Sequence, residues 1–106
     1  MNILNEKIIK EKLLNKQFYL SNHAEKEKQA DTIPFKEIYE SFPKIEIIEK
    51  YPDDKRGYSC LILGFTIENK PLHFVVGNHS SDNLLIITMY RPDESQWINF
   101  RERKKV

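Results

Sequence analysis

The sequence predicts an α+β fold in which N-terminal helices pack on a twisted, roughly four-stranded antiparallel sheet. Three observations support this prediction. Helix-forming residues and helix-start signals fill residues 1–43, strand-like runs fill residues 45–90, and short polar reversals separate those runs. The chain has 106 residues with neither a repeat nor a linker, so we expect residues 1–106 to form a single domain.

The first elements are two predicted helices flanking a short extended segment. Residues 1–17 favour a helix because residues 2–16 contain no Gly or Pro, but their apolar residues form no clean stripe. We therefore expect this helix to pack loosely or to be mobile at its start. Residues 18–20 are a short extended candidate. A polar helix over residues 23–30 then follows Ser21 or Asn22 as the N-cap.

A third helix is predicted to begin near Thr32 and Pro34, since proline is tolerated in a first helical turn. Its apolar residues stand at i, i+3, i+4 and i+7, the spacing of one helix face. They are Phe35, Ile38, Tyr39 and Phe42. This is a good amphipathic face, and Pro43 ends the predicted helix.

The strand-like runs are residues 45–51, 58–67, 72–76 and 84–90. Their reversals carry turn residues, with Gly57 expected to take a positive φ and Pro92 ending the last strand. Consecutive runs joined by short reversals indicate an antiparallel meander. Beyond them, residues 97–103 predict a last helical turn or a tail, and residues 98–106 are expected to form a basic tail.

Composition excludes several classes of protein. The formal net charge of +1 excludes a strongly basic protein that coats nucleic acid. The single cysteine, Cys60, excludes an intrachain disulfide and a Cys-based zinc site, and it fits a reducing compartment. No apolar run is long enough to cross a bilayer, and residues 1–17 lack the pattern of a signal peptide. We therefore expect a cytoplasmic protein with no membrane partner.

The first candidate site is His23, Glu27 and Asp31, spaced four residues apart and so on one side of a helix. A histidine and a carboxylate one turn apart suit general acid–base chemistry. The same residues also fit a metal site, completed by a ligand such as His73 or, less well placed, His79. The alternative without a chemical function is a solvated polar helix face, which is common in charge-rich helices.

The second candidate is His73, which strand alternation places on the face opposite Leu72, Phe74 and Val76. A histidine in an apolar strand is either a hydrogen-bonded structural residue or, given its near-neutral pKa, a catalyst. Cys60 also lies in a strand, where it is expected to act as a small buried hydrophobe.

The third candidate is Tyr90 with Arg91, at the end of the last strand. Arg91 can grip a phosphate with two donors, and Tyr90 can stack on a base or donate a hydrogen bond. A surface ion pair is an equal alternative for Arg91. Arg56 either contacts substrate or pairs with Asp54 across a turn, and Lys104 belongs to a C-terminal basic cluster suited to RNA or an acidic partner.

Several sequence pieces stand in a specific order along the chain: SNHAEKE at 21–27 with Asp31 and Ile33, YPDD at 51–54, RG at 56–57, SCLILG at 59–64, PLHFVV at 71–76, and IITMYRPD at 86–93 with Trp97. In this order and spacing the chain resembles a bacterial domain family of uncharacterised function within the RelE/ParE-like toxin superfamily. The resemblance covers roughly residues 18–103. Many relatives carry arginines where this chain has Glu27 and Asp31, so the chain resembles an acidic subgroup.

The resemblance implies a small RelE-like fold and a type II toxin–antitoxin setting, often with a zinc-finger antitoxin of the MqsA/YgiT type. It also implies metal-independent cleavage of mRNA, with no cofactor. We therefore hypothesise an endoribonuclease with His23 and His73 as the acid–base pair and Glu27 orienting one of them. Arg91 would stabilise the phosphate and Tyr90 would contact a base or the phosphate.

In this hypothesis three further residues contact substrate: Arg56, Asp31 and Lys104. It requires His23, His73 and Arg91 to share one water-accessible hollow. The alternative is a catalytically inactive protein-binding module of the same fold. The near-zero net charge favours that alternative, because RNA-binding proteins usually show a clearer positive footprint.

Overall fold

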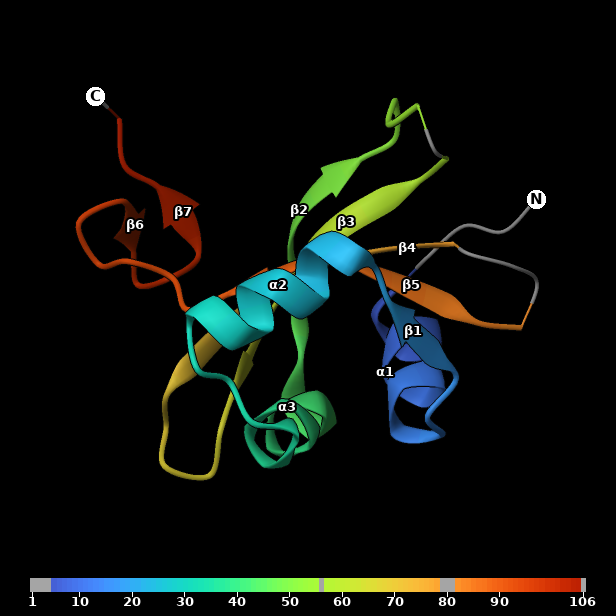
Figure 1. Ribbon diagram of the computed structural model, residues 1–106. Helices are drawn as coiled ribbons and strands as arrows, with labels where there is room; N and C mark the ends of the chain where they lie inside the picture. Colours follow the sequence, from blue (N-terminus) through green and yellow to red (C-terminus); the bar gives the residue numbers. More distant parts are fainter. Residues whose placement is uncertain (1–4, 56, 79–81, 106) are drawn as a thin grey trace.

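The computed structural model describes residues 5–55, 57–78 and 82–105 (Figure 1). The elements in chain order are α1 (Glu6–Leu14), β1 (Phe18–Leu20), α2 (Asn22–Ala30), α3 (Phe35–Ser41), the 3₁₀ turn η1 (Phe42–Lys44), β2 (Glu46–Tyr51), β3 (Ser59–Phe65), β4 (Pro71–Asn78), β5 (Leu84–Tyr90), β6 (Trp97–Ile98) and β7 (Glu102–Arg103). Helices followed by strands confirm the predicted α+β class.

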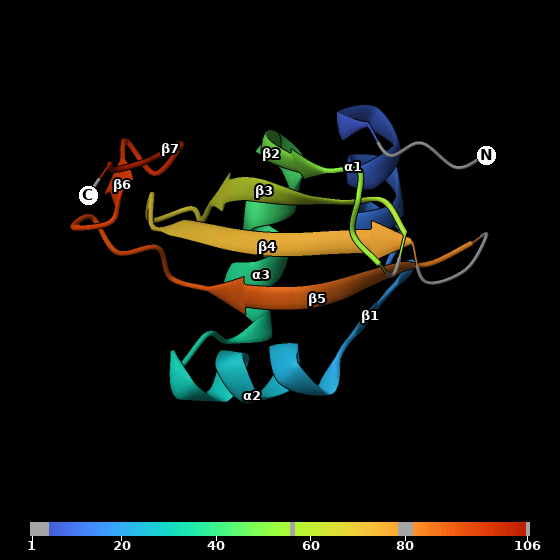
Figure 2. The ribbon, with the colours of Figure 1, turned by 90° about the horizontal axis from the view of Figure 1, so that it is seen from above.

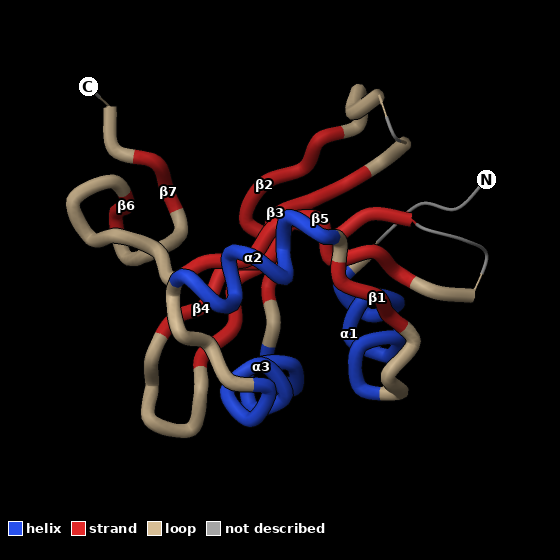
Figure 3. The backbone as a smooth tube through the Cα atoms, in the orientation of Figure 1, coloured by secondary structure: helices blue, strands red, loops and turns tan. Residues whose placement is uncertain are grey.

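Among the described residues, the main sheet has five strands in the order β1-β5-β4-β3-β2. The strands β2 to β5 form the predicted antiparallel meander. The additional strand is β1, the short segment between α1 and α2 in Figure 3, which pairs parallel to β5 with Phe18 opposite Leu84. The sheet is therefore mixed. Segment 18–20 was correctly predicted to be extended, but its pairing was not.

The helices cover one face of the sheet and one of its edges. Figure 2 shows α1 and α3 behind the sheet, α2 alongside β5, and β6 and β7 at one end of the strands, while Figure 1 shows β6 and β7 on the opposite face of the sheet from α1 and α3. We call that opposite face the helix-free face. The largest fully buried side chains lie mainly between helices and sheet, and include Phe42, Phe74, Ile9, Leu13, Ile38, Ile62, Leu72 and Ile86.

The helix α1 is anchored more firmly than its apolar pattern indicates. Ile9 and Leu13 are fully buried in the core, so the expectation of loose packing is wrong for the described part of this helix. Its first predicted residues, 1–4, lie outside the described residues. Ser21, the first of the two cap candidates, caps α2 by accepting a hydrogen bond from the Ala24 N–H at 3.0 Å.

The C-terminal segment forms a hairpin, β6–β7, and neither a helical turn nor a tail. The Arg101 N–H donates to the Ile98 carbonyl, and the two residues between them, Asn99 and Phe100, both have positive φ values of 53° and 63°. This is the backbone of a type I′ turn. A phenylalanine in that conformation is strained, but Phe100 is held by ring packing on Phe65 at 6.4 Å.

Two glycines meet specific backbone requirements. Gly57 has a φ of +103°, as predicted, in the turn before β3. Gly64 lies directly beneath the end of α3, where an added Cβ atom would stand 2.5 Å from the Ser41 carbonyl oxygen. Close packing of α3 on β3 therefore requires a residue without a side chain at position 64.

Candidate functional site

The polar face of α2 binds the backbone of β5. β1 pairs only with the first part of β5, and α2 continues along the same edge. The Glu27 carboxylate accepts the Met89 N–H at 3.0 Å, and the Asp31 carboxylate accepts the Arg91 N–H at 2.9 Å. Ser21 completes the contact by donating its hydroxyl to the Ile87 carbonyl at 2.7 Å. These side chains replace a missing strand and cover a sheet edge.

His23 lies in the first turn of the same helix but is exposed to solvent. Its side chain is 66% exposed, and its Nε2 atom lies 3.2 Å from Oε1 of Glu27. That oxygen is the one that accepts the Met89 N–H. Glu27 therefore contacts both the His23 imidazole and the backbone of β5. The contact of His23 with Glu27 is an exposed i,i+4 interaction.

Arg91 is held by the chain that surrounds it. Its guanidinium donates to both carboxylate oxygens of Glu37 at 2.8 and 3.3 Å, and to the carbonyls of Asp31 and Thr32 at 3.1 and 2.8 Å. The hydrogen bonds that Glu37 accepts from Arg91 lower the pKa of this carboxyl below its ordinary value. Arg91 therefore links the α2–α3 connection to the end of β5.

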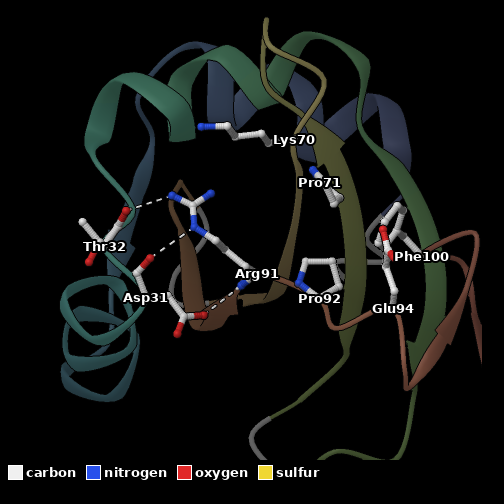
Figure 4. A pocket seen from close by; sticks show the side chains of 8 residues that line it. All are labelled: Asp31, Thr32, Lys70, Pro71, Arg91, Pro92, Glu94 and Phe100. Atoms are coloured by element: carbon white, nitrogen blue, oxygen red, sulfur yellow. Dashed lines mark hydrogen bonds between the residues drawn. The ribbon is translucent and has the colours of Figure 1, made fainter.

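Arg91 and Asp31 also line a pocket of about 460 Å³, which we call the edge pocket (Figure 4). Lys70 and Glu94 also line it, and Pro71, Pro92 and Phe100 provide apolar walls. Its lining thus contains two cations and two carboxylates, and the guanidinium points towards Asp31 and Thr32. This pocket offers little net positive charge to a phosphate.

His73 lies fully buried on the helix-free face, as strand alternation predicts. Nε2 lies 2.8 Å from the Phe100 carbonyl, so it carries the proton, and Nδ1 accepts from the Tyr90 hydroxyl at 3.1 Å. The indole of Trp97 packs edge-on at 4.6 Å. Burial lowers the pKa of His73 below its usual value, so the ring is neutral and both nitrogens are satisfied.

The predicted site residues thus fall into separate groups. His23 pairs with Glu27, Asp31 with Arg91, and His73 with Tyr90. Since His73 is sealed while His23 stands in solvent, the two imidazoles and the Arg91 guanidinium do not share a hollow. Arg56 and His79 lie outside the described residues. Lys104 lies on the C-terminal hairpin, beside a second pocket.

A polar cluster that the sequence analysis missed lies on the helix-free face. It consists of Glu49, Tyr51, Arg103 and Trp97, which we call the hairpin cluster. Arg103 donates to the two Glu49 oxygens at 2.8 and 3.1 Å, and Tyr51 donates a short hydrogen bond to the same carboxylate. The Arg103 guanidinium also lies 4.7 Å from the centre of the Trp97 ring.

Contacts within the hairpin cluster shift the pKa values of Glu49 and Tyr51. Partial burial pulls the pKa of Glu49 upwards, but hydrogen bonds from Arg103 and Tyr51 outweigh it and leave the pKa below its ordinary value. Burial and the bond to Glu49 raise the pKa of Tyr51 to about 12. The carboxylate is therefore ionised and the phenol protonated at neutral pH.

A pocket of about 560 Å³, the hairpin pocket, adjoins this cluster. Its lining residues are Ser95, Gln96, Trp97, Arg103, Lys104 and Lys105. Three of them are cations and none of these described lining residues is a carboxylate. Glu49 balances the charge of Arg103, so Lys104 and Lys105 provide the net positive charge that the edge pocket lacks. The described residues contain no group of three or more His, Cys, Asp or Glu side chains placed to hold a metal.

Sequence signals for this cluster were present but weak. Residues 46–49 begin and end with a glutamate, and the C-terminus carries Arg101 and Arg103, so the two segments have opposite charge. Arg101 indeed pairs with Glu46 at 2.7 Å, next to the Arg103–Glu49 pair. With residues 97–103 interpreted as a helical turn or tail, that complementarity could not be recognised.

Comparison with known proteins places most of this architecture in one family. The family model described as a domain of unknown function, DUF4258, matches residues 20–91. The chain belongs to the DUF4258 family. The DUF4258 match runs from the end of β1 to Arg91, and it contains the α2–β5 contacts, His73 and Glu49, but not Arg103.

No curated protein and no solved structure matches the chain. DUF4258 membership itself assigns no activity. Within the described residues, no helix is long and apolar enough to cross a membrane.

Proposed function

We propose that this DUF4258 protein is a RelE/ParE-like toxin that cleaves RNA without a metal, at the junction of the hairpin pocket with Glu49. The observation that carries the proposal is that three cationic side chains surround a pocket beside a coupled carboxylate and phenol. Phosphodiester cleavage needs a base at the attacking oxygen and positive donors at the phosphate, and this junction offers both.

In the proposed reaction, Glu49 accepts the proton of a ribose 2′-hydroxyl. The 2′-oxygen bonds to the phosphorus while the bond to the 5′-oxygen breaks, and the ammonium of Lys104 or Lys105 protonates the departing oxygen. Arg103 stabilises the charge that develops on the phosphate. The products are a 2′,3′-cyclic phosphate and a free 5′-hydroxyl.

The Arg103–Glu49 pair must open for this reaction, and its exposure supports that step. The Arg103 side chain is 62% exposed, whereas Glu49 is 24% exposed. A phosphate can therefore reach the guanidinium from solvent and replace the carboxylate on it. His73 acts as a positioning residue, because its bond to the Phe100 carbonyl holds the hairpin on the sheet.

A cognate antitoxin, of the zinc-finger type that the resemblance implies, completes the proposal. An RNA substrate also implies that the protein acts in the cytoplasm. A short zinc-finger or DNA-binding protein encoded in the neighbouring reading frame would strengthen the toxin assignment. If no such protein is encoded there, the proposal of a cognate antitoxin fails, while the proposal of RNA cleavage is still tested by the experiment below.

The decisive experiment compares Arg103→Ala with Arg101→Ala. Both residues tie the hairpin to β2 through a glutamate, but only Arg103 lines the hairpin pocket. Purified proteins are incubated with RNA, and fragments with cyclic phosphate ends are counted. We expect cleavage by wild type and Arg101→Ala, and a loss of about 100-fold or more in Arg103→Ala and Glu49→Gln. Equal rates in Arg103→Ala and wild type would refute the assignment.

The second candidate is the inactive protein-binding module. It is favoured by the mutual neutralisation of Arg103 and Glu49 and by the net charge of +1. A wild-type protein that cleaves no RNA in the purified assay, does not slow bacterial growth on induction, and binds a protein partner without salt dependence would establish this candidate in place of the first.

A further inference from the structure

Helix α3 carries an aromatic surface that the fold leaves half uncovered. Ile38 and Phe42 of its apolar stripe are buried, but Phe35 is 44% and Tyr39 is 39% exposed. Their rings stack on each other at 6.1 Å, and Tyr39 also packs edge-on against Phe18 at 6.3 Å. The stripe is thus wider than the surface that the sheet buries.

Two lysines lie over these exposed rings. The Lys28 ammonium is 4.3 Å from the centre of the Phe35 ring, and the Lys16 ammonium is 5.5 Å from that of Tyr39. They come from α2 and from the turn after α1, so three segments converge on the two rings. We call Phe35, Tyr39, Lys16 and Lys28 the aromatic patch.

The charges around the aromatic patch are positive on balance. Of the two acidic residues of α3, Glu37 is bound by Arg91 and Glu40 accepts the Ile67 N–H while facing Lys36. Lys16 and Lys28 present their charge directly at the rings. Exposed apolar surface with a charged rim is typical of a protein-docking site, and aromatic side chains dominate the energy of such sites.

We propose that the aromatic patch docks an acidic amphipathic segment of a partner protein. An apolar side chain of that segment would pack on the stacked rings, and carboxylates one helical turn away would pair with Lys16 and Lys28. The charge of the patch selects this occupant over a basic segment. The inference does not depend on RNA cleavage, since the patch and the hairpin cluster share no residue.

The test uses two synthetic helical peptides of equal length and equal leucine content, one with glutamates and one with lysines at all polar positions. Binding to the full chain is measured by fluorescence anisotropy at two salt concentrations. We expect the acidic peptide to bind more tightly than the basic one, and the Lys16→Glu/Lys28→Glu variant to lose roughly tenfold in affinity for it. Lys26→Glu serves as the matched control, because Lys26 is exposed and lies on α2, as Lys28 does, but outside the aromatic patch.

Several outcomes would overturn the proposal. They are equal binding of both peptides, unchanged binding by the double variant, or an equal loss in Lys26→Glu. A concentration-dependent dimer that Phe35→Glu dissociates would also overturn it, because the occupant would then be a second copy of this chain. Circular dichroism and thermal unfolding of each variant ensure that a loss of binding reflects the patch and not the fold.

Discussion

The carboxylate of Glu27 on α2 accepts the backbone N–H of Met89 on β5 at 3.0 Å, and Asp31 repeats this contact at Arg91. Four residues of a helix rise about 6 Å and two residues of a strand about 6.8 Å, so acids at i and i+4 match amides at j and j+2. This matching of repeats explains the spacing of Glu27 and Asp31 without invoking catalysis.

The first prediction concerns this contact. Replacing Glu27 with Ala leaves the Met89 amide without its partner, so we expect a loss of about 1–3 kcal/mol in the free energy of unfolding. Glu27→Gln keeps an acceptor and should lose less. His23→Ala and Glu25→Ala, both at exposed positions, are the controls and should change stability by less than about 0.5 kcal/mol. Urea unfolding measures all four, and a Glu27→Ala value equal to the controls would contradict the role.

The second prediction compares two arginines. Arg91→Ala removes a guanidinium that joins Glu37 to two backbone carbonyls, and we expect a loss of about 2 kcal/mol. Arg91→Lys should recover little of it, because an ammonium cannot reproduce the fork geometry. Arg101→Ala breaks an exposed pair and should lose at most about 1 kcal/mol. Thermal unfolding ranks the three, and the reverse order would contradict the structural role of Arg91.

The third prediction is a pH dependence caused by His73. Its pKa in the folded protein lies below the ordinary 6.5, mainly because of burial, so the unfolded chain binds the proton more readily. Its contribution to stability is therefore complete above pH 6.5 and declines as pH falls from there towards the folded pKa. The nearby charges of Glu49 and Arg103 oppose each other in this shift.

His73→Phe tests this assignment. The variant keeps a ring but loses both hydrogen bonds, so it should be less stable at pH 8 by about 1–3 kcal/mol. Its stability should fall less between pH 6.5 and pH 5 than that of wild type. Parallel curves of unfolding free energy against pH for the two proteins would show that another group causes the dependence.

The fourth prediction concerns two glycines. A methyl group at position 64 would meet the Ser41 carbonyl at 2.5 Å, and backbone atoms cannot move aside cheaply. Gly64→Ala should lose about 3 kcal/mol, at the upper end of overpacking effects. Gly77→Ala meets the flexible end of Ile87 at 3.2 Å and should lose clearly less. Denaturant unfolding distinguishes the two, and equal losses would mean that α3 shifts on β3 to accommodate the methyl group.

The strands and helices of this chain were largely predictable because their signals are local. Apolar runs bounded by turn residues placed β2 to β5, and the stripe on α3 placed its core face. The β1–β5 pairing was not predictable, because a segment as short as residues 18–20 carries no sequence pattern that identifies its partner strand. The hairpin was missed because its turn uses Asn99 and Phe100 where Asn-Gly would be the recognisable signal.

The candidate site was harder to predict for a related reason. His73 was correctly placed on its strand face, but its partners come from Tyr90 and Phe100, and only the fold brings them together. Glu49 and Arg103 are separated by 54 residues, so their pairing depends on the hairpin that sequence patterns did not reveal. Side-chain type indicated chemistry, whereas tertiary structure decided which side chains meet.

The parallel pairing of β1 with β5 has a consequence for synthesis on the ribosome. Ser21 lies 66 residues before its partner Ile87. The elements α1, β1 and α2 therefore leave the exit tunnel long before β5 emerges from it. Until then Glu27 and Asp31 remain hydrated and α2 has no surface to dock on, because its backbone partners are absent. A nascent chain arrested before β5 should therefore be open to proteases along α1 and α2, and the whole sheet should become resistant in one late step.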